Sequence, residues 1–136
     1  MQRIEDCLFT YGSLMSASGH PMALRLQAEA RSLGAATIFA RLYDLGSYPG
    51  AVGSPDPQDR VHGEMLQLAK PNETFGWLDD YEGCGRDDKE PHAYQRVITP
   101  AWLESGQHID AWVYYYQWPI AEALHLRDGR YVRGKR

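Results

Sequence analysis

The sequence predicts one domain of the α+β class, in which helices and strands are mixed along the chain. The chain has 136 residues, the size of one ordinary domain, so we expect a single domain over residues 1–136. Hydrophobic residues make up 43% and charged residues 24% of it, which is typical of a globular protein with its own core. Five strand-like stretches and two stretches of helical periodicity follow one another in mixed order, which predicts an α+β or mixed α/β architecture.

The first third of the chain predicts a strand, a helix and a second strand. Residues 7–11 are apolar and aromatic, and the turn residue Gly12 follows them, as expected of a short buried strand. Pro21 suits the first turn of a helix, and apolar residues then recur at helical spacing. The pattern predicts a helix over 21–33, and the β-branched and aromatic residues that follow predict a strand over 36–42.

The middle of the chain predicts a long loop, a strand and a second helix. Residues 43–60 hold six glycines and prolines, and this density of helix breakers predicts a loop. Residues 61–69 are strand-like and end on an apolar run. Pro71 suits the start of a helix and Gly83 suits its end, so we expect a helix over 71–82.

The last third predicts a charged surface loop, two strands and a polar tail. The loop covers 84–92, and the strands cover 94–99 and 109–116, of which the second alternates between two faces. Residues 119–136 form a polar segment that becomes basic from Arg127 onward, and we expect it to be a loosely packed terminus.

Charge and composition exclude several classes of protein. The chain has 14 Lys and Arg against 18 Asp and Glu, a net charge of -4, which gives no general attraction for nucleic acid or for an anionic membrane. No apolar run approaches the ~20 residues of a membrane span, and residues 1–6 carry acids where a signal peptide needs a basic start. The cysteines Cys7 and Cys84 suggest neither a disulfide scaffold nor a zinc site. We therefore expect a cytoplasmic protein.

The junction after the first strand is a candidate binding loop. It comprises Tyr11, Gly12, Ser13 and Leu14, and its glycine lets successive backbone N–H groups point outward. Such a concave set of donors can hold a carboxylate or a developing oxyanion. The alternative is a plain loop in which the Ser13 hydroxyl caps a short turn.

Glu82 is a candidate general base. It follows Asp79 and Asp80 in the last turn of the predicted helix, where acidic groups meet the negative end of the helix dipole. If this carboxyl group is also partly buried among aromatic neighbours, its pKa rises and it becomes a usable base near neutral pH. The alternative is a solvated helix face.

Other candidate residues have simpler explanations. The five histidines show no metal-ligand spacing, so we expect no metal site. Ser13 or Cys84 as the nucleophile of an unrelated hydrolase is a further hypothesis, although no partner for either is evident in the sequence. The stripe of Trp112, Tyr114 and Tyr116 is typical of a core strand, but it could also line a pocket.

Six short segments between residues 7 and 118 form an ordered pattern. They are Phe9–Leu14, Leu45–Val52, Val61–Met65, Leu78–Cys84, Tyr94–Arg96 and Ala111–Gln117. In this order they resemble the gamma-glutamylcyclotransferase-like family. The resemblance implies a small mixed β-barrel with two main helices and one open pocket.

The resemblance also implies an activity and a site. Glu82 would be the catalytic base, and residues 11–14 would bind a small-molecule gamma-glutamyl substrate through backbone N–H groups. Tyr94 and Tyr116 would form walls of the pocket. The implied reaction is attack of the substrate's α-amine on its own γ-carbonyl, which releases 5-oxoproline and an amine or amino acid without a cofactor. The alternative is a binding module that holds a glutamyl-like ligand without converting it.

Overall fold

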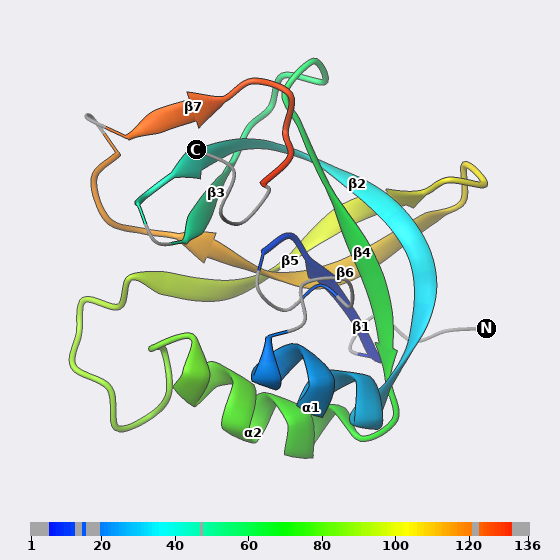
Figure 1. Cartoon of the computed structure of the whole chain (residues 1–136), viewed down its shortest axis with the longest axis vertical. Helices are drawn as coiled ribbons and strands as arrows, with labels where there is room; N and C mark the ends of the chain where they lie inside the picture. Colours follow the sequence, from blue (N-terminus) through cyan, green and yellow to red (C-terminus); the bar gives the residue numbers. More distant parts are fainter. Residues whose placement is uncertain (1–5, 13–14, 16–19, 47, 121–122, 132–136) are drawn as a thin grey trace.

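The computed structural model describes residues 6–12, 15, 20–46, 48–120 and 123–131, which form a β-barrel with two helices packed at one end (Figure 1). The elements in chain order are β1 Cys7–Thr10, α1 Pro21–Glu29, β2 Ala30–Asp44, β3 Pro49–Gly53, β4 Arg60–Leu68, α2 Pro71–Tyr81, β5 Tyr94–Leu103, β6 His108–Tyr116 and β7 Leu124–Leu126. None of the helices in these ranges is long and apolar enough to cross a membrane.

Five strands close the barrel in the order β1-β4-β2-β5-β6. The ring closes because β1 pairs with both β4 and β6, while β2 pairs with both β4 and β5. The pairing of β1 with β6 is parallel and the other four pairings are antiparallel, so the barrel is mixed. This arrangement confirms the predicted α+β class and the mixed barrel with two helices.

The short strand β1 is buried on both faces, which explains its continuous apolar sequence. Cys7 and Phe9 belong to the core inside the barrel. Leu8 points the other way, into a second core that it shares with Leu26 of α1 and Leu78 of α2. A strand that is buried on both faces has a continuous run of apolar residues, whereas a strand with one exposed face alternates between apolar and polar residues.

The two helices lie side by side against the barrel and are tied together by Glu29, the last residue of α1 (Figure 1). Its Oε1 accepts a hydrogen bond of 2.6 Å from the Thr74 hydroxyl and one of 3.0 Å from the Trp77 indole, both on α2. These bonds fix α2 against the end of α1, and the C-terminal end of α2 carries Glu82.

The first helix ends four residues earlier than the predicted limit at residue 33, because β2 begins at Ala30. The backbone of Ala30 already pairs with Leu68 of β4, and the register shifts between Ser32 and Gly34. Gly34 has a φ of 100°, which is the conformation that glycine favours. Strand pairing with β4 therefore overrides the helical periodicity, and Gly34 marks a bulge rather than a helix end.

The predicted loop over 43–60 contains a strand, β3, so this prediction was wrong for residues 49–53. β3 pairs antiparallel with β2 and parallel with β6. A Cβ atom on Gly50 would lie 2.7 Å from Leu45 Cδ1 and 2.9 Å from Tyr116 Cβ. This glycine therefore permits close packing of neighbouring segments, which the sequence did not distinguish from a loop.

The predicted loose terminus is packed where the structure describes it. β7 pairs with the end of β2. The His62 N–H group donates a 2.8 Å hydrogen bond to the carbonyl of Gly129, and a Cβ atom at residue 129 would lie 1.9 Å from the Arg60 carbonyl oxygen. The segment from 123 to 131 therefore covers the barrel instead of extending into solvent.

Candidate active site

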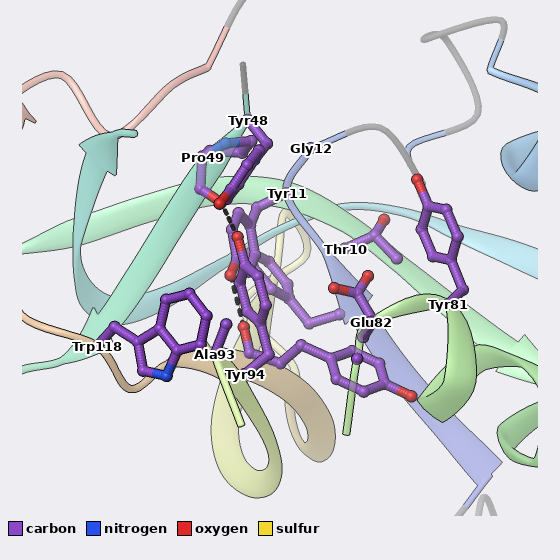
Figure 2. A pocket seen from close by; sticks show the side chains of 13 residues that line it. Thr10, Tyr11, Gly12, Tyr48, Pro49, Tyr81, Glu82, Ala93, Tyr94 and Trp118 are labelled. Carbon is purple, nitrogen blue, oxygen red and sulfur yellow. Dashed lines mark hydrogen bonds between the residues drawn. The ribbon is translucent and has the colours of Figure 1, made fainter. Parts of the chain in front are cut away.

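A cavity of about 390 Å³ lies where the end of β1 meets the end of α2 (Figure 2). Aromatic side chains and backbone from six separate parts of the chain form its walls. The lining residues are Phe9, Thr10, Tyr11, Gly12, Tyr48, Pro49, Tyr81, Glu82, Gly83, Ala93, Tyr94, Tyr114 and Trp118. This volume is within the range of small-molecule sites.

Glu82 is placed at this cavity by the end of α2. Its backbone N–H group donates a 2.9 Å hydrogen bond to the Leu78 carbonyl, and Gly83 then leaves the helix with a φ of 77°. Figure 2 shows the carboxylate directed into the cavity beside Thr10. Among the residues that the structure describes, none forms a hydrogen bond or ion pair with this carboxylate. The group is therefore available to a ligand.

The environment of Glu82 raises its pKa from 4.5 to about 7. The larger cause is burial, which penalises the charged form, and the second is the negative charge of Asp79. The direction agrees with the sequence-based hypothesis. A carboxyl group with a pKa near 7 is present as both base and acid at neutral pH, which suits proton transfer in both directions.

Asp79 is part of a hydrogen-bonded group behind the cavity. Arg96 of β5 donates to both of its carboxylate oxygens, at 2.9 and 3.2 Å. Tyr114 of β6 donates to the same carboxylate at 2.6 Å. The Arg96 guanidinium itself lies 4.0 Å from the centre of the Phe75 ring and 4.4 Å from that of Trp112. This group anchors α2 to two strands of the barrel.

Tyr11 uses its hydroxyl group within the protein. The hydroxyl donates to the Tyr114 carbonyl of β6 at 2.5 Å and accepts from the Ala51 N–H of β3 at 3.2 Å. Burial raises the pKa of this phenol far above its usual range, and the charge of Glu82 adds to the effect. Tyr11 therefore fixes the end of β1 between two strands, while its ring lines the cavity.

Gly12 lines the cavity and cannot be replaced without movement of its neighbours. A Cβ atom at this position would lie 2.8 Å from Pro49 Cγ. The Met15 N–H group donates a 3.0 Å hydrogen bond to the Gly12 carbonyl. The predicted binding residues Ser13 and Leu14 lie outside the described residues.

Tyr94 and Tyr116 occupy different positions relative to the cavity. Tyr94 lines it, and its hydroxyl donates a 2.6 Å hydrogen bond to the Pro49 carbonyl. Tyr116 is not among the lining residues and packs edge-on against Tyr94, with ring centres 5.4 Å apart. Tyr116 therefore supports the wall that Tyr94 forms, rather than facing the cavity.

Several lining residues were not selected from the sequence. Tyr48 and Pro49 lie in a stretch whose glycines and prolines predicted a loop, and Trp118 follows the last predicted strand. The exposure of Trp118 is apparent only in the folded structure, so the sequence has no local signal for it. The approach of Pro49 to Gly12 depends on strand pairing, which has no local signal.

The structure argues against Cys84 as a nucleophile. Burial raises the pKa of its thiol to about 11, and nearby carboxylates add to the effect. The reactive thiolate is therefore scarce at neutral pH. Within the described ranges, no three His, Cys, Asp or Glu side chains lie close enough to hold a metal ion.

The fold and the site define a small mixed-barrel protein with one carboxyl group facing an aromatic cavity. The model of the family described as gamma-glutamyl cyclotransferase, AIG2-like matches residues 8–133. The chain belongs to this family. Its sequence is 33% identical over 126 residues to the gamma-glutamylcyclotransferase family protein YtfP of Escherichia coli, which covers 92% of this chain and 95% of that protein. The corresponding protein of Citrobacter rodentium is 31% identical, covering 92% and 94%.

Solved structures share the fold. The solution structure of E. coli YtfP aligns with a TM-score of 0.61 at 29% identity and covers 93% of this chain and 96% of its own. The crystal structure of a mouse AIG2-like protein aligns with a TM-score of 0.63 at 20% identity, covering 96% and 97%. The second alignment shows that the fold is shared at low sequence identity.

Proposed function

We propose that the protein is an enzyme that cyclises a gamma-glutamyl group and releases 5-oxoproline together with an amine or amino acid. Membership of the family supports this class of reaction. The observation that carries the proposal is the Glu82 carboxyl group, which faces the cavity with a pKa of about 7 and no protein partner among the described residues.

The reaction forms one C–N bond and breaks another. Glu82 takes a proton from the substrate's α-ammonium group, and the freed amine attacks the γ-carbonyl carbon of the same molecule. The tetrahedral intermediate collapses when the protonated Glu82 gives its proton to the leaving nitrogen. Glu82 then takes the second proton from the attacking nitrogen and passes it to the departing amine. Overall, two protons leave the attacking nitrogen and two reach the leaving nitrogen, so the reaction consumes no water and no net proton. A base that becomes an acid in the same cycle works best with a pKa near the working pH.

Two other features of the cavity assist this chemistry. The loop of residues 11–14, of which Ser13 and Leu14 lie outside the described residues, would present backbone N–H groups to the α-carboxylate or to the developing γ-oxyanion. The loss of one such donor typically costs about 3 kcal/mol. The rings of Tyr11 and Tyr94 are fixed by their hydrogen bonds, so the walls are rigid. Rigid walls favour a folded glutamyl chain, and such positioning is worth roughly 7–11 kcal/mol in intramolecular reactions.

The free thiols support a reducing compartment, and we place the protein in the cytoplasm. Cys7 is buried in the barrel and Cys84 is partly buried, and neither forms a disulfide. Unpaired cysteines are typical of proteins that work where thiols stay reduced.

The test is an assay of 5-oxoproline by mass spectrometry with a panel of gamma-glutamyl amino acids and gamma-glutamyl amines. We expect product from the wild type, and a loss of at least about a hundredfold in kcat for Glu82→Gln, which keeps the shape but cannot accept the proton. The matched control is Asp80→Asn, an exposed acid in the same helical turn, which should retain activity. Ligand binding by the wild type without 5-oxoproline would instead support the binding module.

A further inference from the structure

Two exposed aromatic side chains lie at the cavity without a described role. Five large hydrophobic side chains are exposed among the described residues, and only two of them are aromatic: Tyr48 at 44% and Trp118 at 45%. Both line the cavity. In Figure 2 they lie across the cavity from Glu82, with Tyr11 and Tyr94 between them. The protein therefore keeps its two most water-exposed aromatic faces at the entrance to its candidate site.

The two exposed rings are linked through Tyr94 and Tyr116 by a series of ring contacts, and hydrogen bonds hold Tyr94 and Trp118 in place. Tyr48 contacts Tyr94, Tyr94 contacts Tyr116, and Tyr116 contacts Trp118, with ring centres 6.3, 5.4 and 6.3 Å apart. The Tyr94 hydroxyl is bonded to the Pro49 carbonyl, and the Trp118 indole donates a 3.2 Å hydrogen bond to the Pro91 carbonyl. Fixed aromatic surfaces bind a planar group with little loss of side-chain freedom.

Among the described residues, the cavity carries no positive charge to match a carboxylate on the leaving group, in addition to the α-carboxylate of the glutamyl part. None of the described lining residues is Lys, Arg or His, and the only charged one is Glu82. Residues 13–19, which begin with the last two residues of the predicted binding loop, contain no Lys, Arg or His in the sequence. A carboxylate is normally held by a guanidinium or ammonium group, so a leaving group that carries one would be poorly matched here.

We propose that the outer half of the cavity is a subsite for an aromatic leaving group, an amine that carries a planar ring and no carboxylate. This inference rests on the proposed cyclisation. The glutamyl part lies between Gly12 and Glu82, where its γ-carbonyl reacts. The ring of the departing amine packs against Tyr48 and Trp118 at the entrance, from which it leaves after the C–N bond breaks.

The experiment compares three gamma-glutamyl compounds that differ only in the leaving group. They are the gamma-glutamyl amides of phenethylamine, of cyclohexylethylamine and of phenylalanine. The first leaving group carries an aromatic ring, the second a saturated ring of similar size, and the third an aromatic ring with an added carboxylate. We expect kcat/KM for the phenethylamide to exceed that of each other compound by about tenfold. Trp118→Leu keeps an apolar side chain without an aromatic face, and should bring the phenethyl and cyclohexyl values close together.

The matched control is Ile98→Ala, which truncates another exposed hydrophobic side chain that does not line the cavity. This variant should keep the wild-type preference. Equal kcat/KM for the phenethyl and cyclohexyl compounds, or an unchanged preference in Trp118→Leu, would overturn the aromatic subsite while the cyclisation stands.

Binding to Glu82→Gln by calorimetry tests the subsite without turnover. The same order of affinities is expected there, with the phenethylamide the tightest. If no compound yields 5-oxoproline but this order is found, the aromatic subsite is supported and the proposed reaction is wrong. If the three compounds bind equally, the aromatic subsite is wrong whatever the reaction.

Discussion

Asp79 raises the pKa of Glu82, which lies three residues further along the chain, although the Asp79 carboxylate is itself paired with Arg96. The Arg96 guanidinium lies 4.0 Å from the centre of the Phe75 ring and 4.4 Å from that of Trp112, and the pairing does not remove the effect of Asp79 on Glu82. Other groups that interact with the Glu82 charge are Tyr11 on β1, Tyr94 on β5, Tyr114 on β6 and Cys84 after α2. After burial, the carboxylate of Asp79 is the second cause of the raised pKa of Glu82, so it helps to set the pH range in which Glu82 can act.

Changing either member of this ion pair should move the pH profile in opposite directions. Asp79→Asn removes a negative charge beside Glu82 and leaves the positive charge of Arg96, so the pKa of Glu82 falls. Arg96→Gln leaves Asp79 uncompensated, so that pKa rises. The acidic limb of kcat/KM, which follows deprotonation of the base, should move by about one pH unit to lower pH in the first variant and to higher pH in the second.

Asp80→Asn is the control for this pair of changes. Asp80 is exposed on the same helix, so its charge is screened by water and the acidic limb should not move. A purely structural role of Asp79 and Arg96 would lower activity in both variants without shifting the limb in opposite directions. Shifts in the same direction would contradict the electrostatic explanation.

The raised pKa of Glu82 should cost the protein stability at neutral and higher pH. Its folded value of about 7 exceeds the ordinary 4.5, so between these values the folded state binds more protons than the unfolded state. Stability therefore falls as pH rises through this window, and the cost above it is about 3 kcal/mol. Glu82→Gln removes the charge, so its Tm should exceed that of the wild type at about pH 8, and the difference should vanish near pH 4. A difference that is constant with pH would contradict this explanation.

Much of the fold was predictable because its signals are local. The helix over 71–82 was predicted from Pro71, Gly83 and apolar spacing, and α2 runs from Pro71 to Tyr81. The barrel itself came from the resemblance and not from periodicity, because closure depends on β1 pairing with both β4 and β6. No single segment of the sequence shows a pattern that predicts either of these strand pairings.

The incorrect loop prediction and the missed cavity residues both depend on contacts between distant parts of the chain. In the sequence, a glycine in a closely packed strand cannot be distinguished from a glycine in a loop. Gly50 lies in the closely packed strand β3. Glu82 was recognisable as a candidate because its acidic neighbours lie in the same helical turn. Trp118 and Tyr48 were missed because only the folded chain brings them to the same cavity as Glu82.

Gly12 should be intolerant of substitution because of its contact with Pro49. In Gly12→Ala the new methyl group would lie 2.8 Å from Pro49 Cγ, so the loop or the wall must move. Such overpacking typically costs about 1–3 kcal/mol, and the displaced wall should raise KM at least severalfold. Gly76→Ala is the matched control, since a Cβ at this exposed helical position meets nothing within 4 Å. It should raise the unfolding free energy by up to about 1 kcal/mol.

Tyr11→Phe should weaken the barrel more than it weakens proton transfer. The change leaves the Ala51 N–H and the Tyr114 carbonyl without their hydrogen bonds to the hydroxyl, and each lost partner of a buried group costs about 1–3 kcal/mol. We expect a lower midpoint in urea unfolding together with an acidic limb of kcat/KM close to that of the wild type. Since the Tyr11 ring remains at the cavity, loss of activity should follow the loss of folded protein. A large fall in kcat in fully folded protein would instead assign the Tyr11 hydroxyl a direct part in the reaction.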